Sequence, residues 1–402
     1  RRGDQRSRAR VELQYLIGVV HWRQGELERS RTELEAALAL ALALGESERL
    51  LAVRVRKGLG ATLWAQGKAD EAAREFEAVV GTLQEELGPM HPQVGSAVNN
   101  LASAHFSLGR LDLAETEFLQ TLRIYEGCYG DDHPSVNNTL NNLAVVYGNQ
   151  GKLTQARDTM LRVVEILERS GDPDHPELGT AWGNLGRMLQ DLGEYERAAD
   201  YQRRSYEQRS KLLGPTHADT MRSLEGLARA QIDLDQHDEG IANFEQVQAT
   251  LREALGPDHP MVAEAAYLEG MALLQIGRPR EAEIQLRAAL ELRERILTAD
   301  HPDLANTRAA LAAVLVVRGR HREAEALLTQ VFADEAQAKP PARVKAQARF
   351  DLAKISAEQG DWARARTNID EGLAFLETVE GPKAETLREQ MQAWSAALPA
   401  DG

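Results

Sequence analysis

A glycine that returns every 42 residues is the feature that most constrains the fold of this 402-residue chain. The series runs through Gly25, Gly67, Gly109, Gly151, Gly193, Asp235 in place of glycine, Gly277 and Gly319, and Gly360 arrives one residue early. A set of histidines keeps the same step, and all but His217 precede proline: His91, His133, His175, His217, His259 and His301. Such a phase indicates a tandem array of one supersecondary unit that buries its core between neighbours.

Each unit of the array reads as two helices separated by the glycine. In the unit that begins at Pro134, apolar residues recur at helical spacing on both sides of the break: Leu140, Leu143, Ala144 and Tyr147 before it, Ala156 and Met160 after it. Pro134 suits a first helical turn, and Gly151 suits a helix end. Aromatic residues make up only 5% of the chain, which also favours helices over a β-rich core.

The unit resembles the tetratricopeptide repeat, whose first helix carries apolar, leucine and small residues and whose second helix carries an alanine. The clearest copies are Trp182, Leu185 and Gly186 with Ala198, and Val98, Leu101 and Ala102 with Ala114 and Phe118. HEAT-type repeats share the length but not this small-residue pattern. The resemblance implies an all-α, right-handed superhelix, an α-solenoid of nine helix pairs with a C-terminal capping helix.

The period exceeds the usual length of about 34 residues. The excess lies in segments such as GPMHP, GDDHP and GPDHP, and together with LNNLA it resembles the kinesin-light-chain-like subfamily over about residues 85 to 335. Residues 11–84 and 342–380 fit only the general repeat pattern. The coiled-coil segment of a true kinesin light chain is absent from this sequence, so motor binding is not implied.

Three segments follow from the pattern. Residues 1–10, RRGDQRSRAR, are a basic leader expected to continue an upstream domain, since the chain starts at Arg1. Residues 11–382 are expected to form one continuous solenoid, and residues 383–402 a capping helix and tail. Packing is expected to be looser at Asp235, which replaces glycine, and at Glu269, which takes the slot of Leu101 and its equivalents.

Charge and cysteine content limit the classes of partner and the cellular compartment that the chain suits. The net charge of −15 argues against nucleic acid or an anionic membrane as the main partner. The longest apolar run, AALALALALG, is too short to insert across a membrane. Cys128 is the only cysteine, so no intrachain disulfide forms, and a cytoplasmic, reducing location is expected. The same residue is expected to pack as a small buried side chain.

Motifs for catalysis and cofactors are missing from the sequence. The chain holds no phosphate-binding GxxxxGK[ST], HExxH, GxSxG or kinase catalytic-loop pattern, so no enzymatic activity and no cofactor are predicted. The recurring Asp-His-Pro suggests metal ligands, but packed helices lie about 8–10 Å apart while ligands must lie about 2 Å from one ion. These histidines are therefore expected to satisfy free backbone amides where helices begin.

By the same resemblance, first helices line a groove, with slots three, six, nine, ten and thirteen residues before each glycine facing it. Asparagines fill slots nine and ten in three successive units: Asn99, Asn100, Asn141, Asn142 and Asn184. An amide offers a donor and an acceptor, which suits the backbone of an extended peptide. The alternative is that these amides bridge adjacent helices.

Aromatic and basic residues fill other slots of the predicted groove. Trp22, Trp64 and Phe106 stand three before successive glycines, where groove and core positions are equally expected. A second set, Arg187, Arg222 and Arg229, suits a carboxylate or phosphate. Self-pairing is favoured for these arginines, because Asp191 lies four residues from Arg187, and Glu225 and Asp233 each lie four from Arg229.

The predicted function is a non-catalytic protein–protein interaction scaffold that binds an extended peptide or partner segment in its groove. One alternative is a regulatory region of a bacterial serine/threonine kinase whose catalytic domain lies before Arg1; the resemblance and a high ratio of arginine to lysine support it. A second alternative is a structural scaffold that self-associates through its ends or edges. The sequence leaves the partner and the oligomeric state open.

Overall fold

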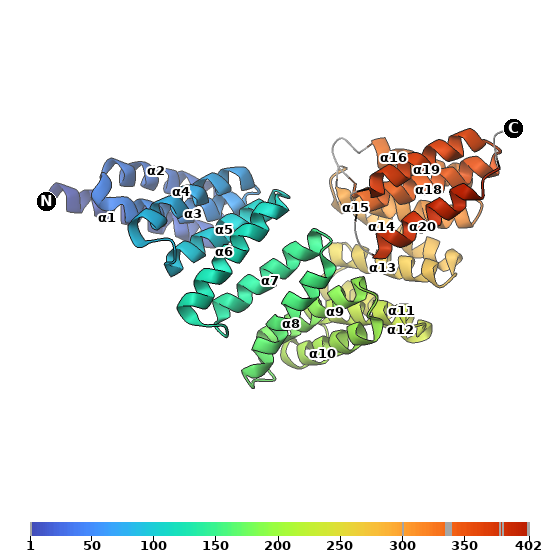
Figure 1. Cartoon of the computed structure of the whole chain (residues 1–402), viewed down its shortest axis with the longest axis horizontal. Coiled ribbons are helices and arrows are strands. Elements are labelled where there is room, and N and C mark those ends of the chain that lie inside the picture. The colour runs from blue at the N-terminus through green and yellow to red at the C-terminus, as the bar shows by residue number, and fades with distance from the viewer. Residues whose placement is uncertain (1, 300, 334–339, 378, 380–381, 400–402) are drawn as a thin grey trace. The chain divides into compact units, whose positions relative to one another are not determined.

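The computed structural model describes residues 2–299, 301–333, 340–377, 379 and 382–399, and all regular structure within these ranges is helical (Figure 1). Nine consecutive helix pairs and a final single helix follow one another along the described chain, as the repeat predicts. The all-α solenoid is therefore confirmed. No helix of the described residues is long and apolar enough to cross a membrane.

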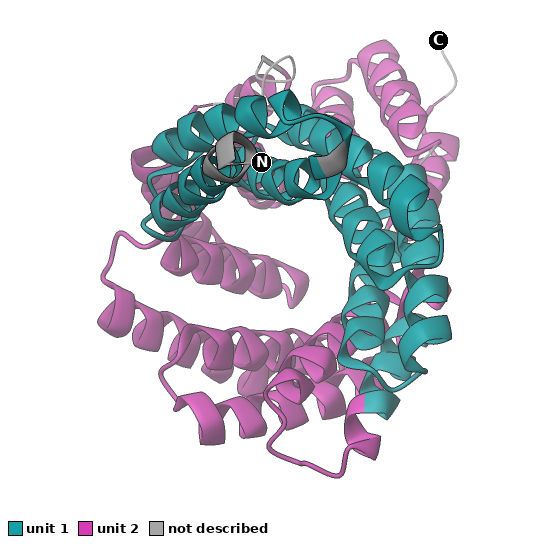
Figure 2. Cartoon of the chain, turned by 90° about the vertical axis from the view of Figure 1, so that its left-hand side faces the viewer, with its two compact units in different colours: residues 1–150, 158–166 teal, residues 151–157, 167–402 magenta. Residues whose placement is uncertain are grey.

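The chain divides into two compact units (Figure 2). Unit 1, residues 1–150 and 158–166, holds α1 (Arg2–Arg23), α2 (Leu27–Ala43), the short 3-10 helix η1 (Glu46–Glu48), α3 (Arg49–Ala65), α4 (Ala69–Leu87), α5 (Pro92–Ser107), α6 (Leu111–Tyr129), α7 (Pro134–Asn149) and the middle of α8 (Leu153–Arg169). Helix α1 takes up most of the basic leader. From α1 to α7, each helix packs against the next one along the chain.

Unit 2, residues 151–157 and 167–402, continues the same pattern. It holds α9 (Pro176–Asp191), α10 (Tyr195–Leu213), α11 (Ala218–Asp233), α12 (His237–Leu255), α13 (Pro260–Gln275), α14 (Pro279–Ile296), α15 (Pro302–Val317), α16 (His321–Ala333), α18 (Ala342–Glu358), α19 (Trp362–Leu376) and α20 (Pro382–Ala396). Helix α20 packs on α18 and α19 and buries Leu387 and Met391, which is the role of the predicted cap.

The turns inside the helix pairs lie where the periodic glycines predict them. All eight of these glycines have φ between 69° and 79°, the left-handed region that glycine enters without a steric penalty. Asp235 keeps the same conformation with φ 59°, and it is the one non-glycine residue with positive φ in the described part of the chain. The predicted register of the array is therefore confirmed down to its one substituted position.

Helix starts are capped by the periodic histidines. In His91, His133, His175, His217, His259 and His301, the ring Nδ1 accepts a hydrogen bond from the backbone N–H two residues later, at 3.1–3.2 Å. The predicted capping role is confirmed. Among the described residues no group of three side chains is arranged to hold a metal ion.

Small residues on the first helices let the second helices approach closely. Ala102, Ala144 and Ala228 are fully buried. A Cβ atom at Gly186 would lie 2.8 Å from Gln202, and one at Gly270 would lie 2.7 Å from Leu286. A larger side chain at either glycine would force Gln202 or Leu286 to shift, so the small-residue pattern that carried the resemblance permits the close helix spacing.

Two expectations from the sequence meet a different environment. Cys128 is exposed, and its Sγ lies 3.4 Å from the carbonyl oxygen of Met90, so the buried packing role was wrong; it lies on the last turn of α6, beyond the buried face. Glu269 is only 3% exposed and keeps the buried position of the leucine that it replaces. Its carboxylate is compensated by amide hydrogen bonds rather than by solvent.

Candidate functional site

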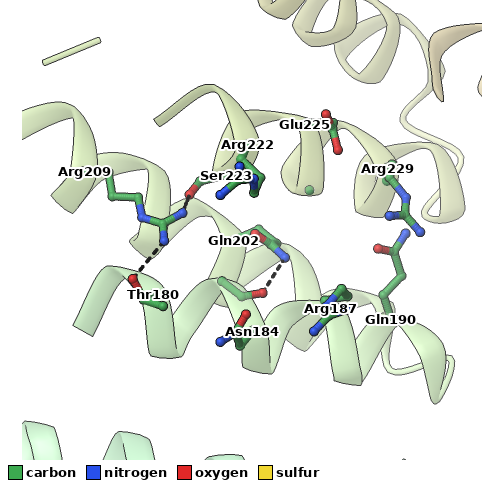
Figure 3. Close-up of a pocket in the computed structure, with 12 residues that line it drawn as sticks. Thr180, Asn184, Arg187, Gln190, Gln202, Arg209, Arg222, Ser223, Glu225 and Arg229 are labelled. Carbon is green, nitrogen blue, oxygen red and sulfur yellow. Dashed lines mark hydrogen bonds between the residues drawn. The ribbon is translucent and has the colours of Figure 1, made fainter. Parts of the chain in front are cut away.

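The predicted groove slots line a cavity of about 290 Å³ in unit 2, which we name the arginine pocket (Figure 3). From α9 it receives the residues thirteen, ten, nine, six and three before Gly193: Thr180, Gly183, Asn184, Arg187 and Gln190. From α11 it receives the residues thirteen, ten, nine and six before Asp235: Arg222, Glu225, Gly226 and Arg229. The structure thus brings together Asn184 and all three arginines of the predicted set.

The wall of the arginine pocket is completed by two residues of α10 that the sequence reasoning missed, Gln202 and Arg209. Gln202 donates from Nε2 to the carbonyl oxygen of Gly183 at 3.0 Å. Arg209 donates to the hydroxyl oxygens of Ser223 at 2.8 Å and Thr180 at 3.0 Å, so its guanidinium is held against the wall. Burial lowers the pKa of Arg209.

The remaining arginines are paired differently from the sequence prediction. Arg222 pairs with Asp219 at 2.8 Å, three residues away on the same helix. Among the described residues, no ion pair joins Arg229 to Glu225 or Asp233, so this part of the self-pairing prediction was wrong. Asp233 instead accepts hydrogen bonds from Gln190 Nε2 at 2.5 Å and from Gln275 Nε2 at 3.0 Å. The pairing of Arg187 with Asp191 stays a prediction.

One carboxyl group lies among the lining residues of the arginine pocket. Glu225 is half-buried and stands between Arg222 and Arg229 along α11 (Figure 3). Burial raises its pKa to about 7, and the charge of Glu264 on α13 acts in the same direction, while Arg229 and Arg222 oppose it. The carboxylate of Glu264 itself pairs with the buried Arg293 of α14.

An apolar pocket continues the arginine pocket along unit 2. This second cavity of about 360 Å³ shares Gln190 and Arg229 with the first. Its apolar lining comes from slots ten, nine, six and three before Gly277, which are Tyr267, Leu268, Met271 and Leu274, and from Ile232 of α11. These four residues of α13 occupy the same slots as the pocket residues of α9 and α11, so the spacing from Gly277 is the sequence signal that marks them.

A separate tryptophan pocket of about 420 Å³ lies in unit 1, lined by Trp22, Ala61, Trp64, Ala65, Phe76, Asn100 and Ser103. Trp22 is 45% exposed and Trp64 49% exposed, so a core role was wrong for both. The indole nitrogen of Trp64 donates to Ser107 Oγ of the next pair at 2.9 Å, which orients the ring. Phe106 is half-buried.

The asparagine row is divided between these surfaces. Asn100 lines the tryptophan pocket, and Asn184 lines the arginine pocket. Asn99 on α5 and Asn141 and Asn142 on α7 are half-buried outside them. The choice between peptide recognition and helix bridging stays open for this row.

The three pockets are lined by guanidinium, amide, hydroxyl, indole and aliphatic groups. The hydroxyl of Ser223, the one with the most polar contacts, lies 2.8 Å from both Ser205 Oγ and an arginine nitrogen, with no histidine among the lining residues to act as its base. Guanidinium groups, amides, indoles and aliphatic side chains suit anionic, polar and apolar groups of a ligand.

One family model described as tetratricopeptide repeat matches the chain at residues 9–85, 93–169, 135–211, 177–239 and 219–295. Two further models with the same description match residues 58–127 and 305–330. A search of curated proteins gives no match.

Two solved structures share this architecture at low sequence identity, and a third is similar with a lower TM-score. NprR, a quorum sensor from B. thuringiensis in its apo form, has a TM-score of 0.61 and 14% identity over 81% of this chain and 87% of its own. A Rap protein complexed with Competence and Sporulation Factor has a TM-score of 0.55 and 14% identity over 86% and 94%. A kinesin-light-chain-like neighbour from Podosopora anserina has a TM-score of 0.47 and 24% identity over 50% and 96%.

Proposed function

Because the chain belongs to the tetratricopeptide repeat family, we propose that it is a non-catalytic protein-interaction scaffold that binds an extended segment of a partner protein along its first helices. The observation that carries the proposal is the coincidence between the groove slots and the pockets: one slot rule accounts for most of the lining residues of all three. A surface that repeats along successive helices suits a ligand that is itself extended.

Each pocket supplies a different kind of contact. The tryptophan pocket offers two exposed indoles, which suit apolar side chains of the partner. In unit 2, Arg187, Arg222 and Arg229 suit an anionic group, and Asn184 suits a peptide backbone. The structural neighbour solved with Competence and Sporulation Factor supports the use of this architecture for capturing a second molecule.

The experiment is a partner capture followed by titration. A partner recovered with the wild-type chain is titrated against Trp64→Ala, which removes an exposed indole, and against Trp362→Ala, a matched control on the second helix α19 whose side chain is 38% exposed. We expect the first change to weaken binding by about 2 kcal/mol and the control to leave it unchanged. Equal affinity for both variants would contradict binding in the tryptophan pocket.

Arg229→Gln is the corresponding test for unit 2, with the exposed Arg252→Gln of α12 as its control. Loss of a charged hydrogen bond to the partner is expected to weaken binding by about 2 kcal/mol. If neither Trp64→Ala nor Arg229→Gln changes the affinity of a captured partner, the first helices are not the binding surface and the proposal fails.

Self-association is a second candidate, favoured by an apolar stripe on α1. Leu13, Leu16, Ile17 and Val20 follow helical spacing and are 61%, 52%, 39% and 51% exposed. A second copy packing on this stripe would bury it. Sedimentation at several protein concentrations, with Leu16→Glu as the disrupting variant, tests this candidate, and a concentration-independent monomer rejects it.

We also place the protein in a reducing compartment, consistent with a cytoplasmic scaffold. Cys128 is the only cysteine and is exposed, and an exposed thiol in an oxidising compartment would pair with other chains or oxidise further. Free-thiol labelling of the protein taken directly from cells should modify this residue almost completely. Protein recovered mainly as a disulfide-linked dimer would contradict the assignment.

A further inference from the structure

Glu225 is an anomaly in a pocket that otherwise suits an anion. The other charged residues that line the arginine pocket are all arginines: Arg187 of α9, Arg209 of α10, and Arg222 and Arg229 of α11. An ionised carboxylate at this place offsets the charge of one arginine and repels an incoming anion. A pocket that served only to hold an anion would gain nothing from it.

Neither of the arginines nearest to Glu225 along α11 forms a salt bridge with it in the part of the chain that the structure describes. Arg222 pairs with Asp219 at 2.8 Å. In Figure 3 the guanidinium of Arg229 is directed toward Gln190, at the end of the pocket away from Arg209. Glu225 therefore lies in the positive electrostatic potential of both arginines, and among the described residues it forms no salt bridge with either of them.

We propose that Glu225 couples anion binding in the arginine pocket to proton uptake, so that the pocket binds an oxyanion of the partner segment together with one proton. This inference rests on the proposed function, because the anion is taken to be a carboxylate or phosphate group of that segment. In the empty pocket above neutral pH the carboxyl is ionised; in the anion complex it carries a proton.

The groups around Glu225 set the pH at which it takes up its proton close to neutral. Burial raises the pKa of Glu225 to about 7, Glu264 of α13 adds to the rise, and Arg229 and Arg222 oppose it. Glu264 is compensated by its ion pair with Arg293. No residue of α12 is among those that line the pocket, and Arg187 of α9 and Arg209 of α10 complete its charges.

The sign of the effect follows from linkage. A bound anion destabilises the ionised form of Glu225 and raises its pKa further, so the anion and the proton favour each other's binding. Lowering the pH through about 7 therefore tightens anion binding. Above that pH, affinity falls by up to about tenfold per pH unit, the limit for uptake of one proton.

The test uses sulfate as the probe, because sulfate does not titrate near neutral pH while phosphate does. Calorimetric titrations at constant ionic strength, at about pH 6 and about pH 8.5 and in two buffers of different ionisation enthalpy, give the affinity and the number of protons taken up. For the wild type we expect tighter binding at the lower pH, at least tenfold, with proton uptake at the higher one.

Glu225→Gln keeps the shape of the side chain and removes its charge. We expect this variant to bind sulfate with the same high affinity at both pH values and without proton uptake. Glu253→Gln, the same change at an exposed position of α12, should behave like the wild type. Arg229→Gln should weaken sulfate binding at both pH values, which places the probe in this pocket, and circular dichroism melts confirm that each variant is folded.

Several results would overturn the inference: no sulfate binding at either pH, wild-type affinity that does not change with pH, or a pH dependence that persists in Glu225→Gln. None of these results touches the scaffold function itself. If the captured partner still loses affinity with Trp64→Ala, the partner-binding proposal stands and only the proton coupling fails. If sulfate behaves as expected but the affinity of no captured partner depends on the pockets, the proton coupling stands and the partner-binding proposal fails.

Discussion

Gln248 donates a hydrogen bond from Nε2 to Oε2 of Glu269 at 2.9 Å, at a place in the helix interface where the repeat otherwise puts leucine. Gln285 donates from its own Nε2 to the other carboxylate oxygen at 2.8 Å. Side chains from α12, α13 and α14 thus form a polar cluster within an apolar array. Burial raises the pKa of Glu269 to about 7, and the charge of Glu245 acts in the same direction.

This cluster predicts a contribution to stability that falls as pH rises. The folded state holds the proton of Glu269 more tightly than the unfolded chain, in which the carboxyl has its ordinary pKa of 4.5. The contribution of Glu269 to the free energy of unfolding is therefore largest below pH 4.5, falls as the pH rises to about 7, and is lowest above it. The difference is about 3 kcal/mol at most.

Glu269→Gln should remove this dependence, because an amide keeps hydrogen bonding without a charge to bury. Urea unfolding at about pH 5 and about pH 8 should show the variant more stable than the wild type at the higher pH, with the gain shrinking at the lower. The exposed Glu253→Gln serves as the control. A gain of the same size at both pH values would mean that packing, and not ionisation, sets the stability here.

The left-handed conformation of Asp235 predicts an order of stabilities. A side chain with a Cβ atom at φ 59° is strained, although aspartate tolerates this region better than most residues. Asp235→Gly should stabilise the chain or leave it unchanged, whereas Asp235→Ala should lower the free energy of unfolding by about 1 kcal/mol. Chemical denaturation of the three proteins checks the order, and an alanine variant as stable as the glycine variant would show that the turn is not strained.

Because the periodic histidines cap helices, we expect stability to depend on their side chains and not on a bound metal ion. His259 accepts from the backbone N–H of Met261 at 3.2 Å, so His259→Ala should lower the free energy of unfolding by about 1 kcal/mol and His259→Asn should restore most of it. The unfolding midpoint of the wild type should be the same with and without EDTA. A midpoint that falls with EDTA would mean that a metal ion contributes to folding.

The parts of the fold that could be predicted are those governed by backbone geometry at fixed spacing. A break such as Gly193 or Asp235 needs a left-handed residue, and the small residue at Gly186 is dictated by contact with the adjacent helix, so both leave a mark in the sequence. The slot rule then locates most of the residues that line the three pockets, since the breaks set the rotation of each first helix.

The remainder of the site depends on side chains that cross from second helices. Arg209 reaches the hydroxyls of Thr180 and Ser223 because of its length and rotamer, and the residues one period before and after it, Leu167 and Leu251, are leucines. In the same way, the amide partners of Asp233 are Gln190 on α9 and Gln275 on α13, which spacing along α11 does not predict. Sequence spacing along one helix predicts which residues are neighbours, but contacts from the adjacent helix decide which of them pair.

The asparagine row gives the most direct test of whether the first helices were kept for recognition. Asparagine is a weak helix former, so replacing Asn99, Asn100 and Asn142 with alanine should leave the free energy of unfolding unchanged or raise it. Affinity for the captured partner should fall by about 1 kcal/mol for each hydrogen bond lost to a buried backbone group.

A matched control lies at the end of α7. Asn149 is outside the groove slots, and its Nδ2 donates to the carbonyl oxygen of Val145 at 2.8 Å on an exposed surface, so Asn149→Ala should leave affinity unchanged. Thermal melts and binding titrations on both proteins separate the two roles of an amide. Opposite changes in stability and affinity indicate residues retained for binding. A triple variant that melts earlier but binds its partner as tightly as the wild type would assign these asparagines to helix packing instead.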